Sequence, residues 1–443
     1  MTATIPELAA RLSDGRTSSE ELVEECLARV ADPDGEGERT YLLVDADGAR
    51  DAARAMDALR SSGAEPTPYA GIPVSIKDLF DVRGQVTRAG SRVLDGPPAE
   101  RDAAAVARWR QAGLIPIGRT NMTEFAFSGL GINSHHGTPA NPWDRGARRI
   151  PGGSSSGAVV SVTDEMAYGA LGTDTGGSCR IPAALCGIVG WKPTQARVPS
   201  EGVVPLSPTL DTVGVLGRSV DCCAILEAIL AGAEPRPVEA LERPPRLAVV
   251  RNYVFDDTDD AVAAAFERAS RRLRDAGAEL VDLELPELDW IPEMNAGGGF
   301  AAAESFAWHR DLIAANADGY DPLVLPRIRR GEQQSTQDLI VLRERRAAFI
   351  GGISRRLHGF DGFICPTVPR VAPPLHTLED GDAYTATNVL MLRNPAVVNM
   401  LDGCAISLPM HEQGEPPTGL MLSGLAGEDA AILRTAAWIE RRT

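Results

Sequence analysis

Two lysines stand out among the residues that could carry acid–base chemistry. Lys77 and Lys192 are the only lysines among 44 basic residues, and all the others are arginines. A lysine amine can lose its proton when it is buried among apolar groups, whereas a guanidinium stays charged. Lys77 ends the apolar segment GIPVSIK, where desolvation would lower its pKa from a reference value of about 10.4 toward neutrality. We therefore expect Lys77 to be a general base, and we expect a structural role for Lys192 in GWKPT.

Two segments rich in glycine and serine could supply a nucleophile and a proton relay for such a base. GGSSSG at 152–157 and GTDTGGSCR at 172–180 each lead into an apolar stretch, which favours functional loops over a flexible linker. Ser178 follows two glycines and precedes a short helix that we expect to close at Gly187. The backbone N–H groups from Thr175 to Ser178 would meet at the start of that helix, where they suit a developing oxyanion.

A competing serine pattern lies in the first of these segments. GSSSG at 153–157 formally matches the GxSxG nucleophile elbow with Ser155 in the centre, and His376 or His411 would supply the later histidine. The preceding residues DRGARRIP do not read as the buried strand that an elbow requires. An esterase of the α/β-hydrolase type is therefore the weaker alternative.

Metal and dinucleotide motifs are missing from the sequence. It contains no HExxH, no paired cysteine spacing, no GxGxxG after a strand and no GxxxxGK[ST]. His135 and His136 adjoin the glycine-rich region, but two neighbouring histidines alone do not predict a metal site. We expect neither a metal nor a cofactor.

The composition limits the partners and the compartment. The 443 residues carry a formal net charge of −17, so nucleic acid or an anionic membrane is not expected as the main partner. Seven cysteines without a CxxC pair indicate reduced thiols rather than a disulfide framework. With no secretion-like start and no long apolar run, we expect a cytoplasmic protein, either a monomer or a homodimer, that acts on a small molecule.

The elements that must position these residues alternate between helices and short buried strands, which predicts an α/β architecture. We expect helices over 20–30, 102–112 and within 258–276, and strands over 72–77, 114–118, 246–250 and 278–285. We also expect 361–374 to be a strand that ends in a proline-rich loop. A strand and a helix should form the last thirty residues. The segment 286–345 contains several helical stretches, and we interpret its Arg-rich part, 327–346, as a solvated helix face without a function.

Several of these motifs together resemble the amidase-signature hydrolases. The resemblance rests on GIPVSIKDLFDV, RTNMTEFAFSG, GTPANPWD, PGGSSSGAVV and ALGTDTGGSCRIPAALCGIVGWKPT, which follow in order over at least 70–220. DGFICPTVPRVAPP, GCAISLP and PPTGLML fit the C-terminal part of the family. The resemblance implies one large domain over 1–443 with a central mixed, mostly parallel twisted sheet covered by helices on both faces. Its parts would be an N-terminal helical region (1–60), a signature core (70–220), a variable substrate-side insertion (246–345) and a C-terminal part of the same core (360–443).

The resemblance also assigns roles to individual residues. The Ser–cis-Ser–Lys triad of the family falls on Ser178 as nucleophile, Ser154 as relay and Lys77 as base, with the serines 24 positions apart as in the family. It implies a cis peptide between Gly153 and Ser154. The remaining assignments from the resemblance are an oxyanion hole from Thr175, Gly176, Gly177 and Ser178, and an acyl-side lining from Ala126, Phe127 and Ser128. From their residue types, we expect Asp174 and Arg180 to support the loop through hydrogen bonds and charge pairing, and Cys179 to pack in the core.

The activity that this implies is hydrolysis of a small amide, urea-like or carbamate (urethane) substrate through an acyl-enzyme, with esterase or urethanase side activity. Ser156 stands where many members have glycine, which affects local backbone shape only. Ile181 follows Arg180 where tRNA-linked glutamine amidotransferase subunits have glutamine, so the sequence favours a stand-alone amidase. The alternatives are a catalytically silent binding protein and a partner-dependent amidotransferase subunit.

Overall fold

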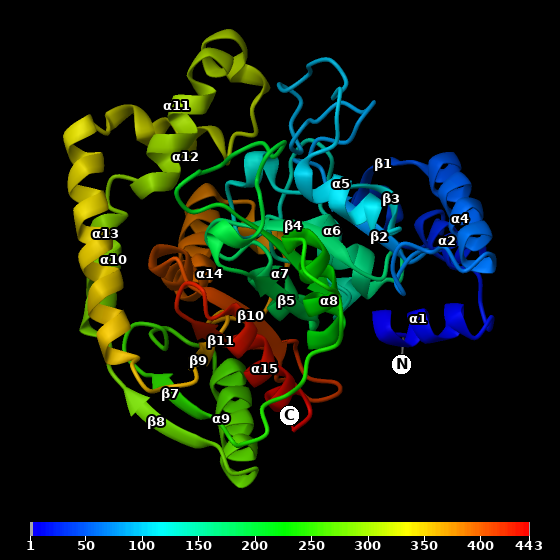
Figure 1. Ribbon diagram of the computed structural model, residues 1–443. Coiled ribbons are helices and arrows are strands. Elements are labelled where there is room, and N and C mark those ends of the chain that lie inside the picture. Colours follow the sequence, from blue (N-terminus) through cyan, green and yellow to red (C-terminus); the bar gives the residue numbers. More distant parts are fainter. Residues whose placement is uncertain (1–2, 443) are drawn as a thin grey trace.

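Eleven strands form one continuous sheet through the molecule (Figure 1), seen in a computed structural model that describes residues 3–442. The strands are β1 (Tyr41–Val44), β2 (Pro73–Lys77), β3 (Ile115–Thr120), β4 (Ala170–Asp174), β5 (Val189–Lys192), β6 (Thr212–Gly217), β7 (Arg246–Val250), β8 (Glu279–Leu283), β9 (Phe363–Pro366), β10 (Cys404–Pro409) and β11 (Gly419–Gly424). Their order in the sheet is β1-β3-β2-β4-β6-β5-β10-β11-β9-β7-β8. The single α/β domain expected from the sequence is confirmed.

Helices flank this sheet. They are α1 (Ile5–Ser13), α2 (Ser19–Val30), α3 (Gly37–Thr40), α4 (Ala46–Ser61), α5 (Ala104–Gln111), α6 (Ser156–Thr163), α7 (Arg180–Cys186), α8 (Val220–Ala231), α9 (Asp260–Asp275), α10 (Ile291–Met294), α11 (Gly299–Asn316), α12 (Leu325–Arg329), α13 (Thr336–Arg356), α14 (Gly381–Leu401) and α15 (Asp429–Glu440). Within residues 3–442, none of the helices has the length and apolar character needed to cross a membrane.

The strand directions differ from the sequence-based expectation in one respect. The sheet is mixed, but only β2 with β3, β2 with β4, β7 with β8 and β7 with β9 pair in parallel. The other pairs are antiparallel, including the central run from β4 through β6, β5, β10 and β11 to β9. The expectation of a mostly parallel sheet is therefore wrong: helical crossovers join the parallel pairs, whereas the strands of the central run pair in opposite directions.

Local signals explain where the elements near the site begin and end. Ser18 caps α2 with a capping box to Glu21, as expected for a serine before an amphipathic run. β2 and β4 are buried along their whole lengths and pair in parallel, so their carboxyl ends meet at one edge. Lys77 ends β2, and Thr173 lies one residue before the end of β4. α7 closes at Gly187, whose φ of +74° places it in the left-handed region that favours glycine.

The segment 246–345 contributes both to the sheet and to its flank. β7 and β8 extend the sheet at one end, so this part of the segment belongs to the core. The helices α10, α11, α12 and α13 stand together along one side of the molecule (Figure 1). α14 contacts both α13 and α7, and thereby connects this flank with the signature core. The Arg-rich stretch expected as one helix face is divided between α12, a 3-10 turn and α13.

Candidate active site

Lys77 is fully buried, and its amine lies between two hydroxyl groups. Its Nζ donates to Ser154 Oγ at 2.7 Å and to Thr173 Oγ1 at 2.9 Å. Burial lowers the pKa of Lys77 to about 8, because nearby anionic groups only partly offset the loss of water. A substantial fraction of the amine is therefore neutral near physiological pH, as expected of a general base.

The loop that carries Ser154 contains a cis peptide bond between Gly153 and Ser154, as the resemblance implied. Backbone contacts fix this loop on both sides: Gly153 N–H donates to Gly129 O at 2.8 Å, and Thr123 N–H donates to Ser154 O at 3.1 Å. A side chain at Gly153 would collide with the backbone of Gly131, so only glycine fits there. The result is a Ser154 hydroxyl held against the Lys77 amine.

Ser155 is not arranged as a nucleophile elbow. It is the residue before α6, and no strand runs directly into it within the described residues. Its hydroxyl donates to the carbonyl of Thr173 at 3.4 Å, and no histidine is among its hydrogen-bond partners within residues 3–442. The structure therefore disfavours the α/β-hydrolase alternative.

A buried carboxylate shapes the loop that carries Ser178. Asp174 accepts hydrogen bonds from the N–H groups of Gly177 (2.9 Å) and Cys179 (3.1 Å) and forms a bidentate ion pair with Arg180. Although burial opposes ionisation, the Arg180 guanidinium lowers the pKa of Asp174 to about 2. Both side chains are fully buried. The carboxylate therefore stays charged and holds the turn from inside the protein.

The same contacts occupy one of the backbone N–H groups that the sequence predicts as oxyanion donors. The Gly177 N–H already points at Asp174, so it is occupied. The N–H groups of Thr175, Gly176 and Ser178 make no hydrogen bond within the described part of the chain, and neither does the Ser178 hydroxyl. Ser178 is 3% exposed at this position. Free N–H groups thus flank a free hydroxyl at the start of α7.

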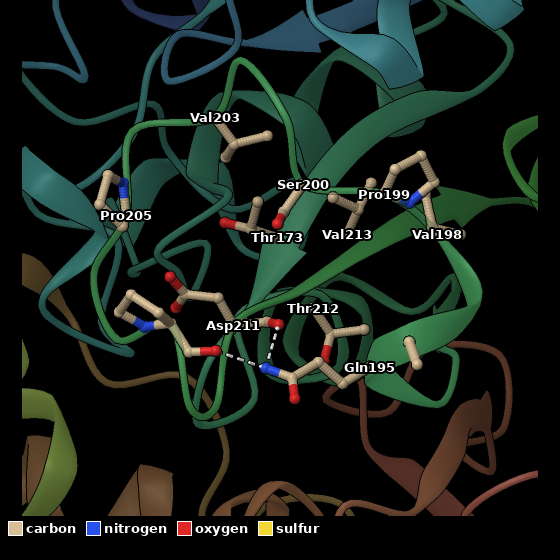
Figure 2. A pocket seen from close by; sticks show the side chains of 12 residues that line it. Thr173, Gln195, Val198, Pro199, Ser200, Val203, Pro205, Asp211, Thr212 and Val213 are labelled. Carbon is tan, nitrogen blue, oxygen red and sulfur yellow. Dashed lines mark hydrogen bonds between the residues drawn. The ribbon is translucent and has the colours of Figure 1, made fainter.

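A cavity of about 340 Å³ opens beside Thr173 (Figure 2). Thr173 and Thr175 point to the same face of the chain as it leaves β4, and Thr175 donates to the carboxylate of Asp211, another lining residue. Gln195 closes part of the wall by donating to Pro208 O at 2.7 Å and to Asp211 O at 3.1 Å. Because Thr173 also accepts from Lys77, the cavity lies one side chain away from the amine.

The segment Ala126–Ser128 is buried, and it begins at the last residue of a 3-10 turn (Glu124–Ala126) in which Phe125 and Ala126 have positive φ angles. The Ser128 hydroxyl donates to Asn388 Oδ1 of α14 at 2.8 Å. The guanidinium carbon of Arg327 lies 5.0 Å from the centre of the Phe127 ring. Helices α12 and α14 therefore both reach this segment.

These contacts bring together motifs that are far apart in the sequence. The comparison with known proteins identifies the same family as those motifs do. A family model described as Amidase matches residues 21–433. The chain belongs to the amidase family. The amidase fold and the amidase-signature motifs identified in the sequence are thereby confirmed.

Individual relatives of this amidase cover its whole length. A 2-amino-5-chloromuconic acid deaminase from Comamonas testosteroni is 38% identical over 99% of this chain and 95% of its own length. A glutamyl-tRNA(Gln) amidotransferase subunit from Anaeromyxobacter sp. (strain K) is 34% identical over 98% of this chain and 95% of its own. A crystal structure of an amidase superposes with a TM-score of 0.90 at 32% identity, over 99% of this chain and 100% of that one.

Other residues of the amidase lie where the sequence analysis expected structural roles. Lys192 is buried and donates to the carbonyls of Pro193 (2.9 Å) and Gly403 (2.6 Å), which ties β5 to the start of β10. Cys179 is fully buried. Sequence reasoning missed Thr173 as a partner of Lys77. Its place in the sequence, five residues before Ser178 and on the strand that pairs with β2, could have identified it as a partner of Lys77.

Proposed function

We propose that this amidase hydrolyses the C–N bond of a small amide, urea-like or carbamate substrate through an acyl-enzyme on Ser178. The observation that carries the proposal is the buried contact between the Lys77 amine and the Ser154 hydroxyl, with Ser178 at the start of the neighbouring helix. Neutral Lys77 accepts the proton of Ser154. Ser154 accepts the proton of Ser178 once the two hydroxyls, which form no hydrogen bond with each other within the described residues, come into contact. The Ser178 oxygen then forms a bond to the substrate carbonyl carbon, whose oxygen becomes the oxyanion.

The later steps use the same groups in reverse. The N–H groups of Thr175, Gly176 and Ser178 stabilise the oxyanion, and the loss of one such donor typically costs about 10²–10³ in rate. The lysinium returns a proton through Ser154 to the leaving nitrogen, and the C–N bond breaks. Water then attacks the acyl carbon while Lys77 takes its proton through Ser154. The bond between the acyl carbon and Ser178 Oγ breaks, the proton returns through Ser154 to Ser178, and the acid product leaves.

Covalent labelling tests the nucleophile. A fluorophosphonate should modify Ser178, located by mass spectrometry of the labelled peptide, and Ser178→Ala should abolish both labelling and amide hydrolysis. A label on Ser155 would contradict the triad and favour an elbow-type esterase. Folded protein that neither reacts nor hydrolyses amides would indicate a silent binding protein.

A second candidate function follows from the relative that is part of a glutamyl-tRNA(Gln) amidotransferase. In that case the chain would need partner proteins to act. We favour the stand-alone enzyme because Ile181 stands where the resemblance places glutamine in those subunits. Purified alone, the chain should turn over simple amides; glutamine hydrolysis that appears only with co-purifying chains would favour the partner-dependent role.

A further inference from the structure

Within residues 3–442, Arg327 on α12 carries a guanidinium that lacks an anionic partner. Its Nε is buried and has no hydrogen-bond acceptor there, and no carboxylate of the described chain forms an ion pair with it. Its guanidinium does contact the face of Phe127. Burial lowers the pKa of Arg327, since nothing nearby compensates fully for its lost hydration. The side chain as a whole is half-buried, and only Nε is both buried and without an acceptor. A half-buried guanidinium without a carboxylate partner is available to an anionic ligand.

Asn388 on α14 presents a second donor without an acceptor in the described chain. Its Oδ1 accepts from Ser128 Oγ and from Gly129 N–H, both at 2.8 Å. A backbone N–H can only donate, so the amide oxygen must face Gly129 and the amide nitrogen must face away. That nitrogen, Nδ2, is buried and has no acceptor among the described residues.

Both donors adjoin the segment that the sequence analysis placed on the acyl side of the site. Arg327 covers Phe127, and Asn388 holds Ser128 and Gly129. The carbonyl of Gly129 in turn accepts from Gly153 N–H, at the cis peptide before Ser154.

α14 brings this corner close to the nucleophile loop as well. Leu392, one turn after Asn388, lies against that loop, where a methyl group at Gly176 would be 3.3 Å from its Cδ2. Asn388 therefore lies one helical turn from a residue that reaches the Gly176 loop, and Arg327 is linked to the same corner through Phe127.

The carboxylates near this corner are already engaged. Asp321 accepts from the N–H groups of Ser134 and Leu323 and from the Ser134 hydroxyl. Glu124 accepts from Ser91 and from Asp321 N–H, and it contacts His135. Among the described residues, the Arg327 guanidinium and the Asn388 amide nitrogen therefore have no carboxylate oxygen as an acceptor.

We infer that the substrate of this amidase carries a carboxylate, which Arg327 and the Nδ2 group of Asn388 bind. The inference rests on the proposed hydrolase function and adds the substrate class to it: a small amide whose acyl part ends in a carboxylate, such as the monoamide of a dicarboxylic acid. A guanidinium matches a carboxylate in shape and charge, and an amide N–H₂ supplies a further donor.

Matched substrates test this directly. We compare kcat/KM for monoamides of dicarboxylic acids with about three to six carbons against butyramide and valeramide, in which a methyl group replaces the carboxylate. A hydrogen bond to a charged group is strong enough to change kcat/KM by about 10-fold or more. We therefore expect kcat/KM for the best monoamide to exceed that of its uncharged analogue by at least this factor. Arg327→Met should remove the preference through KM, and Arg327→Lys should restore part of it.

Two further variants make the test specific. Asn388→Asp keeps an acceptor for Ser128 and Gly129 but replaces the amide donor with an anionic oxygen. It should lower kcat/KM for the monoamides by about 10-fold or more relative to kcat/KM for butyramide measured on the same variant. Arg329→Met is the control, since Arg329 lies on the same helix but is exposed.

A binding measurement separates this inference from the proposed function. Ser178→Ala should bind succinamate in a calorimetric titration, and the added Arg327→Met change should abolish that binding. If no amide is hydrolysed but this Arg327-dependent binding is found, the hydrolase proposal fails and the carboxylate site stands. If butyramide and the monoamides are hydrolysed equally, or if Arg327→Met binds succinamate as well as its parent does, the carboxylate site is wrong and the hydrolase proposal stands.

Discussion

At the scale of single residues, the surroundings of Lys77 suit a proton that must move in both directions. Its two hydrogen-bond partners are hydroxyl groups, which can donate as well as accept. A carboxylate partner would hold the lysine in its charged form, whereas hydroxyl groups stabilise the two forms more evenly. An arginine at this position would stay protonated at every physiological pH and could not serve as a base.

The pH dependence of amide hydrolysis follows from this environment. Because burial lowers the pKa of Lys77 to about 8, the base is protonated and inactive below that pH and neutral above it. We expect kcat/KM for an amide to rise with pH and to reach half its maximum near pH 8. A pH profile measured under stable-protein conditions checks this. A rate that is flat from about pH 6 to 10, or that falls through pH 8, would contradict the proposed role.

The identity of the leaving group provides a second test at the same residue. An amine leaves poorly unless it is protonated, whereas p-nitrophenolate leaves without a proton. Lys77→Ala should therefore reduce amide turnover much more than turnover of a p-nitrophenyl ester with the same acyl group. General acid–base assistance of this kind contributes about 10²–10⁴ in rate. Equal losses on both substrates would show that Lys77 does not deliver the proton.

At the scale of elements, the turn between β4 and α7 depends on Asp174. Its carboxylate holds two backbone N–H groups and the Arg180 guanidinium, and Arg180 also donates to Pro395 O and Asn399 Oδ1 of α14. The loop that carries Ser178 and helix α14 are thus joined through one buried ion pair. This explains why the proposed oxyanion donors keep their direction without a ligand.

Removal of that charge should affect both stability and activity. Asp174→Asn leaves the buried Arg180 uncompensated, and breaking such a pair costs about 3–5 kcal/mol in the free energy of unfolding. Asp14→Asn breaks the exposed pair with Arg16 and should cost at most about 1 kcal/mol. Urea denaturation of both variants and kcat of both on one amide provide the comparison. Equal effects of the two substitutions would mean that the turn does not depend on Asp174.

The sequence predicted those elements whose signals are contiguous. The cap at Ser18, the buried strand that ends at Lys77 and the glycine at the end of α7 are each encoded within a few residues. The donors on α12 and α14 were missed because their role depends on contacts with a segment far earlier in the chain; Asn388 and Ser128 are 260 positions apart. The Arg-rich pattern predicted a solvated face, and only the packing of α12 against Phe127 sets Arg327 apart from its neighbours.

At the scale of the whole molecule, strand direction is set by connections that local patterns do not encode. A buried apolar run such as GLMLSG in β11 reads the same whether its neighbours are parallel or antiparallel, so the antiparallel centre of the sheet was not predicted. Overall charge, in contrast, follows from composition alone. The formal net charge of the chain is −17. The substrate that we infer is also anionic, so the protein as a whole repels it.

This charge predicts a salt effect that distinguishes substrates. The acidic surface repels an anionic monoamide over distances comparable with the Debye length, about 10 Å at 0.1 M salt. As sodium chloride rises from about 10 to 200 mM, kcat/KM for succinamate should increase several-fold, because screening weakens this repulsion. Butyramide carries no charge, so its kcat/KM should stay constant and report any general effect of salt on the enzyme. A decrease for succinamate would mean that local attraction by Arg327 outweighs the field of the whole protein even outside the pocket.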